Sequence, residues 1–253
     1  MKKNRLPLYQ NPHLEGKSLF WPGNATGVLL IHGFTATTAE VRWLAEAFKT
    51  QGLTISAPLL PGHGTSPQDM NRQHYTDWIA CVQSAYHKLR ESCAKVIVGG
   101  ESMGAILCLF LASEHRDLDA LLLYSPAIRV DNLRYAGILK FFFPLLEKSN
   151  NDPNDTSWQG YTVNPLYAAD ELRKLLRAVL GRLTLIRQPA LILQGIYDKT
   201  IHPESGRMIY NGIQSPVKRL EIMRESGHVM LLGKEIERII TVSMEFLKSA
   251  DIL

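Results

Sequence analysis

The chain has 253 residues, 45% of them hydrophobic and 21% charged, as in an ordinary folded globular protein. A chain of this length can bury a core without disulfides or metals. The net charge of +4 is spread along the sequence, and the nearest approach to a basic cluster is Lys2, Lys3 and Arg5. The composition therefore disfavours a disordered chain and a nucleic-acid partner.

Cysteine usage and hydropathy favour a cytoplasmic location. Cys81, Cys93 and Cys108 cannot all pair, and they fit no metal or redox spacing. The basic N-terminus is not followed by the apolar stretch of a signal peptide. The longest apolar run, Ala105–Ala112, is much shorter than the ~20 residues of a membrane span. We expect a soluble cytoplasmic protein with no integral membrane segment.

Short apolar runs alternate with segments of helical periodicity, which predicts an α/β fold with a mostly parallel sheet flanked by helices. The predicted strands are Gly27–Ile31, Leu53–Ala57, Lys95–Val98, Leu118–Tyr124, Ala190–Leu193 and Val217–Met223. The last strand contains three charged residues, so we expect it near an edge of the sheet. Four helices are predicted. The first runs from Thr37 or Thr38 to Phe48, the next two are Thr76–Glu91 and Ser102–His115, and the last contains Ile236 to Leu247.

The stretch from about residue 127 to 187 interrupts this alternation and contains no convincing strand. It contains the apolar run Phe141–Leu146, a polar run Lys148–Ser157 and the helical-looking segment Ala168–Leu185. Ordered insertions of this length are usually functional. We expect a small helical cap inserted into one domain that spans residues 1–253. An ordinary pair of packing helices is the alternative.

A nucleophile-elbow pattern follows the third predicted strand. Gly100, Ser102 and Gly104 form a G-x-S-x-G motif between this strand and a helix, the context that presents a serine hydroxyl on a sharp turn. The two glycines remove Cβ atoms that would clash in the turn. The motif is short, and a glycine-rich turn with a capping serine is the alternative.

The chain supplies an acid and a base in the order that this motif requires. Asp198 and His228 each follow a predicted strand, at the end where open α/β sheets place their sites. We therefore predict Ser102 as nucleophile, His228 as base and Asp198 as the acid that orients the histidine. Asp131 and Glu225 are weaker candidates for the acid. The remaining histidines, which we expect to be solvated, structural or at the site entrance, are His13, His74, His87, His115 and His202.

Two backbone N–H groups must stabilise the oxyanion of the intermediate. One is expected from Met103, directly after the nucleophile, and the other from Phe34, whose peptide is freed by Gly33. We interpret His32 as a support for this loop. The glycine-rich loop Pro61–Ser66 is either a plain turn or a second support.

These motifs together resemble the bacterial carboxylesterase and monoacylglycerol lipase branch of the α/β-hydrolase superfamily. The residues that carry the resemblance are His32-Gly33-Phe34-Thr35, Gly62-His63-Gly64, Gly100-Glu101-Ser102-Met103-Gly104, Asp198 and Gly227-His228-Val229. The resemblance implies an eight-stranded, mostly parallel sheet with a small cap after the sixth strand. It also implies hydrolysis of short- to medium-chain acyl esters or monoacylglycerols without a metal or organic cofactor.

Glu101 departs from the pattern, since relatives often have His or Leu before the nucleophile. A carboxylate beside the elbow would oppose the developing negative charge unless it is neutralised or points away. Ala105 and Ala36 stand where relatives often have glycine.

An apolar acyl pocket is expected under the cap, and a patch that binds a membrane or a protein partner is the alternative for the Phe141–Leu146 run. The predicted substrate-binding residues are Gly33, Phe34, Phe142, Leu146, Trp158, Tyr161 and Val229. The fold and the triad do not fix the bond that is cleaved, so a thioesterase, an amidase or a C–C bond hydrolase stays open. A non-catalytic ligand-binding protein is a further alternative. We expect a small-molecule acyl ester as partner, and a monomer or homodimer.

Overall fold

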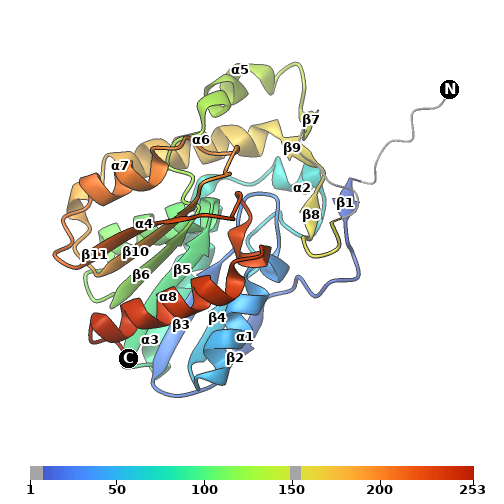
Figure 1. The fold of residues 1–253 in the computed structure, drawn as a ribbon. Coiled ribbons are helices and arrows are strands. Elements are labelled where there is room, and N and C mark those ends of the chain that lie inside the picture. The colour runs from blue at the N-terminus through green and yellow to red at the C-terminus, as the bar shows by residue number, and fades with distance from the viewer. Residues whose placement is uncertain (1–7, 149–154) are drawn as a thin grey trace.

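The computed structural model describes residues 8–148 and 155–253 (Figure 1). Its central sheet has seven strands in the order β11-β10-β6-β5-β3-β4-β2, and only the pairing of β2 with β4 is antiparallel. The strands are β2 (Leu19–Trp21), β3 (Thr26–Ile31), β4 (Thr54–Ala57), β5 (Lys95–Glu101), β6 (Ala120–Tyr124), β10 (Ala190–Gly195) and β11 (Lys218–Met223). All six predicted strands are present, and the charged β11 lies at an edge as expected.

The eight strands implied by the family resemblance are one more than the seven of this sheet. The first described strand, β1 (Tyr9–Gln10), does not extend the sheet. It pairs antiparallel with β8 (Gly160–Tyr161) instead.

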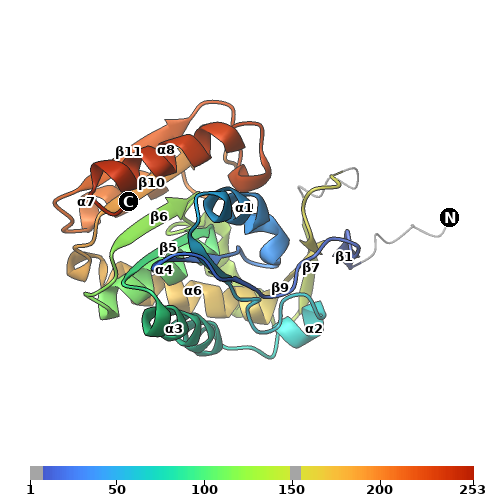
Figure 2. The same cartoon turned by 90° about the horizontal axis from the view of Figure 1, so that it is seen from below.

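Helices cover both faces of the sheet (Figure 2), which is why its strands are apolar on both sides. Val28 and Leu30 of β3 pack toward α1 (Arg42–Thr50) and α8 (Ile236–Ser249). Leu29 and Ile31 point to the other face. The helices on that face are α3 (Tyr75–Ser92), α4 (Met103–Glu114), α6 (Leu166–Leu180) and α7 (Ser205–Gly212). Among the described residues, no helix is long and apolar enough to cross a membrane.

The cap follows β6, where the resemblance implies it, but it is not purely helical. Its elements are a 3-10 turn (Asp131–Tyr135), α5 (Ala136–Leu139), β7 (Leu145–Glu147), β8, β9 (Val163–Pro165) and α6. The prediction of no strand in this region was therefore wrong. The three strands have only two or three residues, too few for an alternating pattern to show in the sequence. β7 pairs with β9, and β8 pairs with β1.

The remaining short elements are α2 (Pro67–Met70) and the 3-10 turns Thr38–Val41, Leu183–Leu185 and Met230–Leu232. The first of these turns leads directly into α1, in the stretch where the sequence predicts one continuous helix.

The strand order indicates where on the sheet a site can form. Neighbouring strands β3 and β5 are followed by crossovers that run in opposite directions, to β4 on one side and to β6 on the other. A crevice opens at the carboxyl ends of strands at such a switch point. The segment after β3 begins with His32 and Gly33, and the residue after β5 is Ser102.

Candidate active site

Ser102 lies on a strained turn between β5 and α4. Its backbone angles are φ 56° and ψ −114°, in a region that side-chain-bearing residues rarely adopt. A Cβ at Gly104 would lie 2.0 Å from the carbonyl oxygen of Ile31, and one at Gly100 would lie 2.5 Å from the carbonyl carbon of Gly104. The close approach of α4 to the sheet therefore requires glycine at both positions, as the motif predicts.

The structure brings the three predicted triad residues together. His228 Nε2 lies 2.9 Å from Ser102 Oγ, and His228 Nδ1 lies 2.8 Å from Asp198 Oδ2. With Nδ1 donating its proton to the carboxylate, Nε2 is free to accept the serine proton. This arrangement can turn a weak hydroxyl nucleophile into a strong one.

The Asp198 carboxylate is fixed on both of its oxygens. The side chain is fully enclosed, and Oδ1 accepts hydrogen bonds from the backbone N–H groups of Thr200, at 2.9 Å, and Ile201, at 3.2 Å. Oδ2 accepts from His228. Donors therefore face both oxygens, an environment that suits an ionised carboxylate and fixes the ring orientation of the histidine.

The loop after β3 lies against the nucleophile. A Cβ at Gly33 would be 3.3 Å from the Cβ of Ser102. The Gly33 N–H donates to Glu40 Oε2 at 2.5 Å, which orients the peptides of this loop. Phe34, the predicted donor, is the next residue. The other predicted donor, the Met103 N–H, is at the start of α4, where helix N–H groups have no intrahelical acceptor.

Thr35 connects this loop to the cap. Its φ of 65° is unusual for a β-branched residue. Its carbonyl accepts from the Tyr161 N–H at 3.0 Å, and its hydroxyl accepts from Lys148 Nζ at 2.5 Å while donating to the Phe34 carbonyl. The cap thus holds the loop that contains the predicted oxyanion donor.

His32 and Tyr161 hold the 61–66 loop and the residue before it, Leu60. His32 Nε2 accepts from the Leu60 N–H at 3.1 Å, so Nδ1 carries the ring proton and donates to the Gly33 carbonyl. Burial lowers the pKa of His32 to about 4, which keeps the ring neutral. The Tyr161 hydroxyl donates to the Gly62 carbonyl at 2.7 Å and accepts from the Thr65 N–H at 2.9 Å. Each contact fixes the 61–66 loop.

The Glu101 carboxyl is buried against the segment that follows His228. Glu101 is 1% exposed, and its Oε1 accepts from the N–H groups of Met230, at 2.6 Å, and Leu231, at 3.1 Å. These residues form the turn directly after His228. Glu101 thus ties the nucleophile elbow to the histidine loop.

The predicted substrate-binding residues lie in three different environments. Phe142 and Leu146 are 72% and 46% exposed on the cap. Tyr161 is fully buried, and the indole N–H of Trp158 lies 3.3 Å from Glu40 Oε1. Val229 is partly buried beside the base.

The weaker candidates for the acid lie elsewhere. Asp131 forms a surface ion pair with Arg129 at 3.1 Å. Glu225 is exposed, and its N–H donates to Glu235. The His202 ring accepts from the Glu204 N–H at 3.2 Å.

Comparison with known proteins identifies the family of this chain. The sequence model of the hydrolase family described as "Serine aminopeptidase, S33" matches residues 24–235, from β3 to the start of α8. The chain belongs to this family.

Similar proteins include esterases and lipases. The chain is 34% identical over 242 residues to a thermostable monoacylglycerol lipase of Bacillus sp. (strain H-257), covering 94% of this chain and 96% of that protein. It is 28% identical over 239 residues to a carboxylesterase of Bacillus subtilis (strain 168), covering 93% and 97%. A solved structure from a study of the metagenome-derived lipolytic enzymes LipS and LipT superposes with a TM-score of 0.88 at 30% identity, covering 92% and 98%.

Two residues of this family member were not singled out from the sequence. Glu40 lies in the 3-10 turn that leads into α1, and acidic residues are common at such a helix start. Its side chain is nevertheless buried, 4% exposed, and contacts the Gly33 N–H beside the nucleophile. Lys148 begins a polar run, but its ammonium group lies over the Trp158 ring at 4.6 Å. No local pattern marks either residue, because their partners are more than 100 positions away or become adjacent only in the fold.

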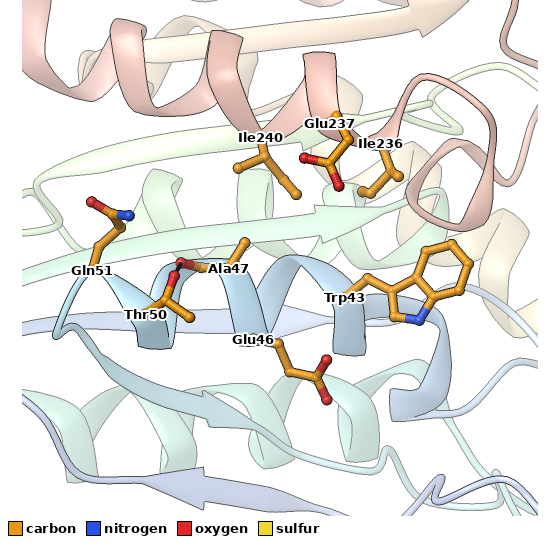
Figure 3. A pocket seen from close by; sticks show the side chains of 8 residues that line it. All are labelled: Trp43, Glu46, Ala47, Thr50, Gln51, Ile236, Glu237 and Ile240. Atoms are coloured by element: carbon orange, nitrogen blue, oxygen red, sulfur yellow. Dashed lines mark hydrogen bonds between the residues drawn. The ribbon is translucent and has the colours of Figure 1, made fainter.

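A groove of about 390 Å³ between α1 and α8 lies apart from these residues (Figure 3). Its lining is Trp43, Glu46, Ala47, Thr50, Gln51, Ile236, Glu237 and Ile240. None of the triad or loop residues described above lines it. The triad residues lie instead beyond the carboxyl ends of β5, β10 and β11, beside the loop that follows β3.

Proposed function

We propose that this chain is a serine carboxylic-ester hydrolase that acts on short- to medium-chain acyl esters or monoacylglycerols. The observation that carries the proposal is the continuous hydrogen-bonded path from Ser102 Oγ through His228 to Asp198. The similarity to a monoacylglycerol lipase and a carboxylesterase over nearly the whole chain supports the ester as the bond that is cleaved.

The reaction begins with attack by Ser102 Oγ on the ester carbonyl carbon. His228 Nε2 takes the hydroxyl proton as the new C–O bond forms, and Asp198 stabilises the resulting imidazolium. The imidazolium then gives this proton to the leaving alkoxide as the ester C–O bond breaks. An acyl-enzyme on Ser102 and a free alcohol result.

Deacylation repeats these steps with water. His228 takes a proton from the water, whose oxygen attacks the acyl carbon, and returns the proton to Ser102 Oγ as the acyl bond breaks. The carboxylic acid leaves, and the enzyme is restored. In both tetrahedral intermediates the Phe34 and Met103 N–H groups donate to the oxyanion.

The cap selects the acyl chain in this proposal. Phe142 and Leu146 present apolar surface to the substrate, and Gly33, Phe34 and Val229 line the approach to Ser102. Trp158 and Tyr161 hold the cap to the loops below through their polar atoms.

In this proposal the cap and the sheet form one hydrolase domain, and the protein works as a monomer or a homodimer. The protein is cytoplasmic in this proposal, since the free thiols of Cys81, Cys93 and Cys108 suit a reducing compartment.

An amidase is the second candidate, since the matching family is described as a serine aminopeptidase. The same triad can attack an amide or a thioester carbonyl. The experiment is a panel of p-nitrophenyl esters of graded acyl length, run beside acyl-thioesters and anilides, with Ser102→Ala as the inactive variant. We expect turnover of the oxygen esters to exceed that of the anilides. Turnover confined to anilides or thioesters would refute the ester assignment.

A further inference from the structure

Two buried carboxyl groups lie beside the nucleophile, and the proposed mechanism uses neither. Glu101 directly precedes Ser102, and its side chain is almost fully buried. The Oε2 of Glu40 would lie 3.0 Å from a Cβ at Gly33, a position that is itself 3.3 Å from the Cβ of Ser102. Two negative charges here would oppose the oxyanion that forms on the substrate.

The hydrogen bonds of Glu40 use both carboxyl oxygens as acceptors. Oε2 accepts from the Gly33 N–H at 2.5 Å, and Oε1 accepts from the Trp158 indole N–H at 3.3 Å. Neither donor can accept a proton in return. Donors therefore face both oxygens of Glu40, an environment that favours the ionised carboxylate over the protonated form.

The hydrogen bonds of Glu101 use one oxygen only. Oε1 accepts from both Met230 N–H and Leu231 N–H. Oε2 is buried and, within the described part of the chain, has no hydrogen-bond partner. Leaving an ionised oxygen unpaired in the interior is costly, whereas a carboxyl protonated on Oε2 keeps both Oε1 contacts and loses the charge.

We infer that in the working enzyme the Glu40 carboxyl is ionised and the Glu101 carboxyl is protonated on Oε2. Glu101 thereby acts as an uncharged positioning residue that joins the elbow to the histidine loop. The inference rests on the proposed ester hydrolysis only for its kinetic consequences, since the protonation states can be measured without a substrate.

The surrounding charges favour these protonation states. Burial raises the pKa of Glu101 well above its ordinary value, and the charge of Glu40 raises it further. Burial also leaves the pKa of Glu40 above its ordinary value, although the Gly33 N–H, His228, the Trp158 N–H and Lys148 each counter part of the rise. The charged and titratable groups that face the pair are Asp198 and Tyr124 toward Glu101, and Lys148 and His228 toward Glu40. The two carboxyls influence each other's titration, and we place the proton on Glu101 because only its Oε2 lacks a donor among the described residues.

A protonated Glu101 implies that activity falls at alkaline pH. As the pH rises through the raised pKa of Glu101, this carboxyl ionises next to Ser102. The new negative charge opposes oxyanion formation, so kcat falls at high pH. We therefore attribute the fall of kcat at high pH, the alkaline limb of the rate profile, to ionisation of Glu101.

The test compares two isosteric variants. Glutamine resembles a protonated carboxyl, with one accepting oxygen and one donating group. Glu101→Gln is expected to lower kcat at pH 7 by only about twofold to fivefold and to remove the alkaline limb. In Glu40→Gln, the side-chain amide must direct an N–H group at the donor N–H of Gly33 or Trp158, so one hydrogen bond is lost. We expect kcat to fall by about 10- to 100-fold with KM little changed, because the loop that contains the predicted oxyanion donor is disturbed. Glu46→Gln, an exposed change on α1, is the control and should leave the profile unchanged.

A substrate-free measurement separates this inference from the proposed function. Infrared spectra across a pH titration should show a protonated carboxyl that persists at pH 7 in the wild type and is missing in Glu101→Gln. Its persistence supports the inference even if no ester is turned over. Absence of this band in the wild type, or a Glu101→Gln loss as large as that of Glu40→Gln in a folded protein, would overturn it.

Discussion

The floor of the site and the cap above it are built in contrasting ways. On the floor, Ser102, His228 and Asp198 are joined by hydrogen bonds, and backbone donors hold Asp198 in place. On the cap, the aromatic side chains of residues 141–143 are 56–72% exposed. In the proposed function, the sheet fixes the chemistry, while the cap selects what reaches it.

Apart from the apolar packing of α6 in the core, the floor and the cap meet at polar contacts near the site. Trp158 reaches Glu40, Lys148 reaches Thr35, and Tyr161 reaches the 61–66 loop. Changes on the floor should therefore reduce kcat for every ester alike. Changes on the cap should alter KM in a way that depends on acyl length, and changes at the contacts should combine both effects.

Asp198→Asn should give the largest effect in this series. An amide cannot accept from both the histidine and the two backbone donors, so the ring loses its orientation. We expect kcat to fall by about 10³- to 10⁴-fold with KM little changed, measured on esters of every length. Asp131→Asn, at the surface ion pair, is the matched control and should leave kcat unchanged. A loss below tenfold for Asp198→Asn would contradict the assigned triad.

Gly104→Ala tests the rigid elbow. The added Cβ would meet the Ile31 carbonyl oxygen at 2.0 Å, so β3 or α4 must shift. We expect the free energy of unfolding to fall by about 2–4 kcal/mol, measured by urea denaturation, together with most of the activity. At Gly181 the nearest heavy atom to an added Cβ is 3.9 Å away, so Gly181→Ala should be tolerated. Equal stability losses in the two variants would show that the elbow is not tightly packed.

Lys148→Met tests the contact between cap and floor. Burial lowers the pKa of Lys148 from 10.5 to about 7, so the folded protein binds this proton less readily than the unfolded chain. The wild type therefore gains stability as the pH rises from about 7 to 10.5, relative to the variant. We expect the stability of Lys148→Met relative to the wild type, as the difference between their free energies of unfolding, to be highest at pH 7 and below. This advantage should decrease toward pH 10, because the wild type becomes more stable over that range.

The control for this prediction is Lys88→Met, on the exposed face of α3. Its difference from the wild type should not change with pH over the same range. A pH-independent difference for Lys148→Met as well would mean that Lys148 is solvated in the folded protein.

Phe142→Ser should give the smallest effect, confined to substrate selection. We expect KM for a long-chain p-nitrophenyl ester to rise by about twofold to fivefold, with KM for the acetyl ester and the Tm unchanged, since each lost CH₂ contact is worth up to about 0.8 kcal/mol. Phe20→Ser, an exposed change on edge strand β2, is the control. A uniform change at every acyl length would place Phe142 outside the acyl path.

The sequence predicts the floor better than the cap for a physical reason. The strands are continuous apolar runs, and the residues of the triad follow three of them in a fixed order, so local patterns suffice. The cap strands β7, β8 and β9 have two or three residues each, and they form by pairing: β7 with β9 inside the cap, and β8 with β1, far away in the chain.

The carboxyl pair was beyond local patterns for a related reason. Glu40 has the usual position of an acidic residue at a helix start, and its burial depends on Gly33 and on Trp158, 118 positions away. The neighbour of the nucleophile, Glu101, is visible in the sequence as a misplaced charge, but its donors, Met230 and Leu231, lie 129 and 130 positions away. Only the fold shows how that charge can be neutralised.

The measurement that tests the central claim most directly is stoichiometric labelling with a fluorophosphonate, followed by peptide mass spectrometry. The reagent phosphonylates a serine activated by a hydrogen-bonded histidine. We predict one phosphonyl group per chain, on the peptide that contains Ser102, with ester hydrolysis lost in proportion and no labelling of Ser102→Ala. Labelling of a different residue, or full ester turnover by a chain labelled at Ser102, would contradict the account.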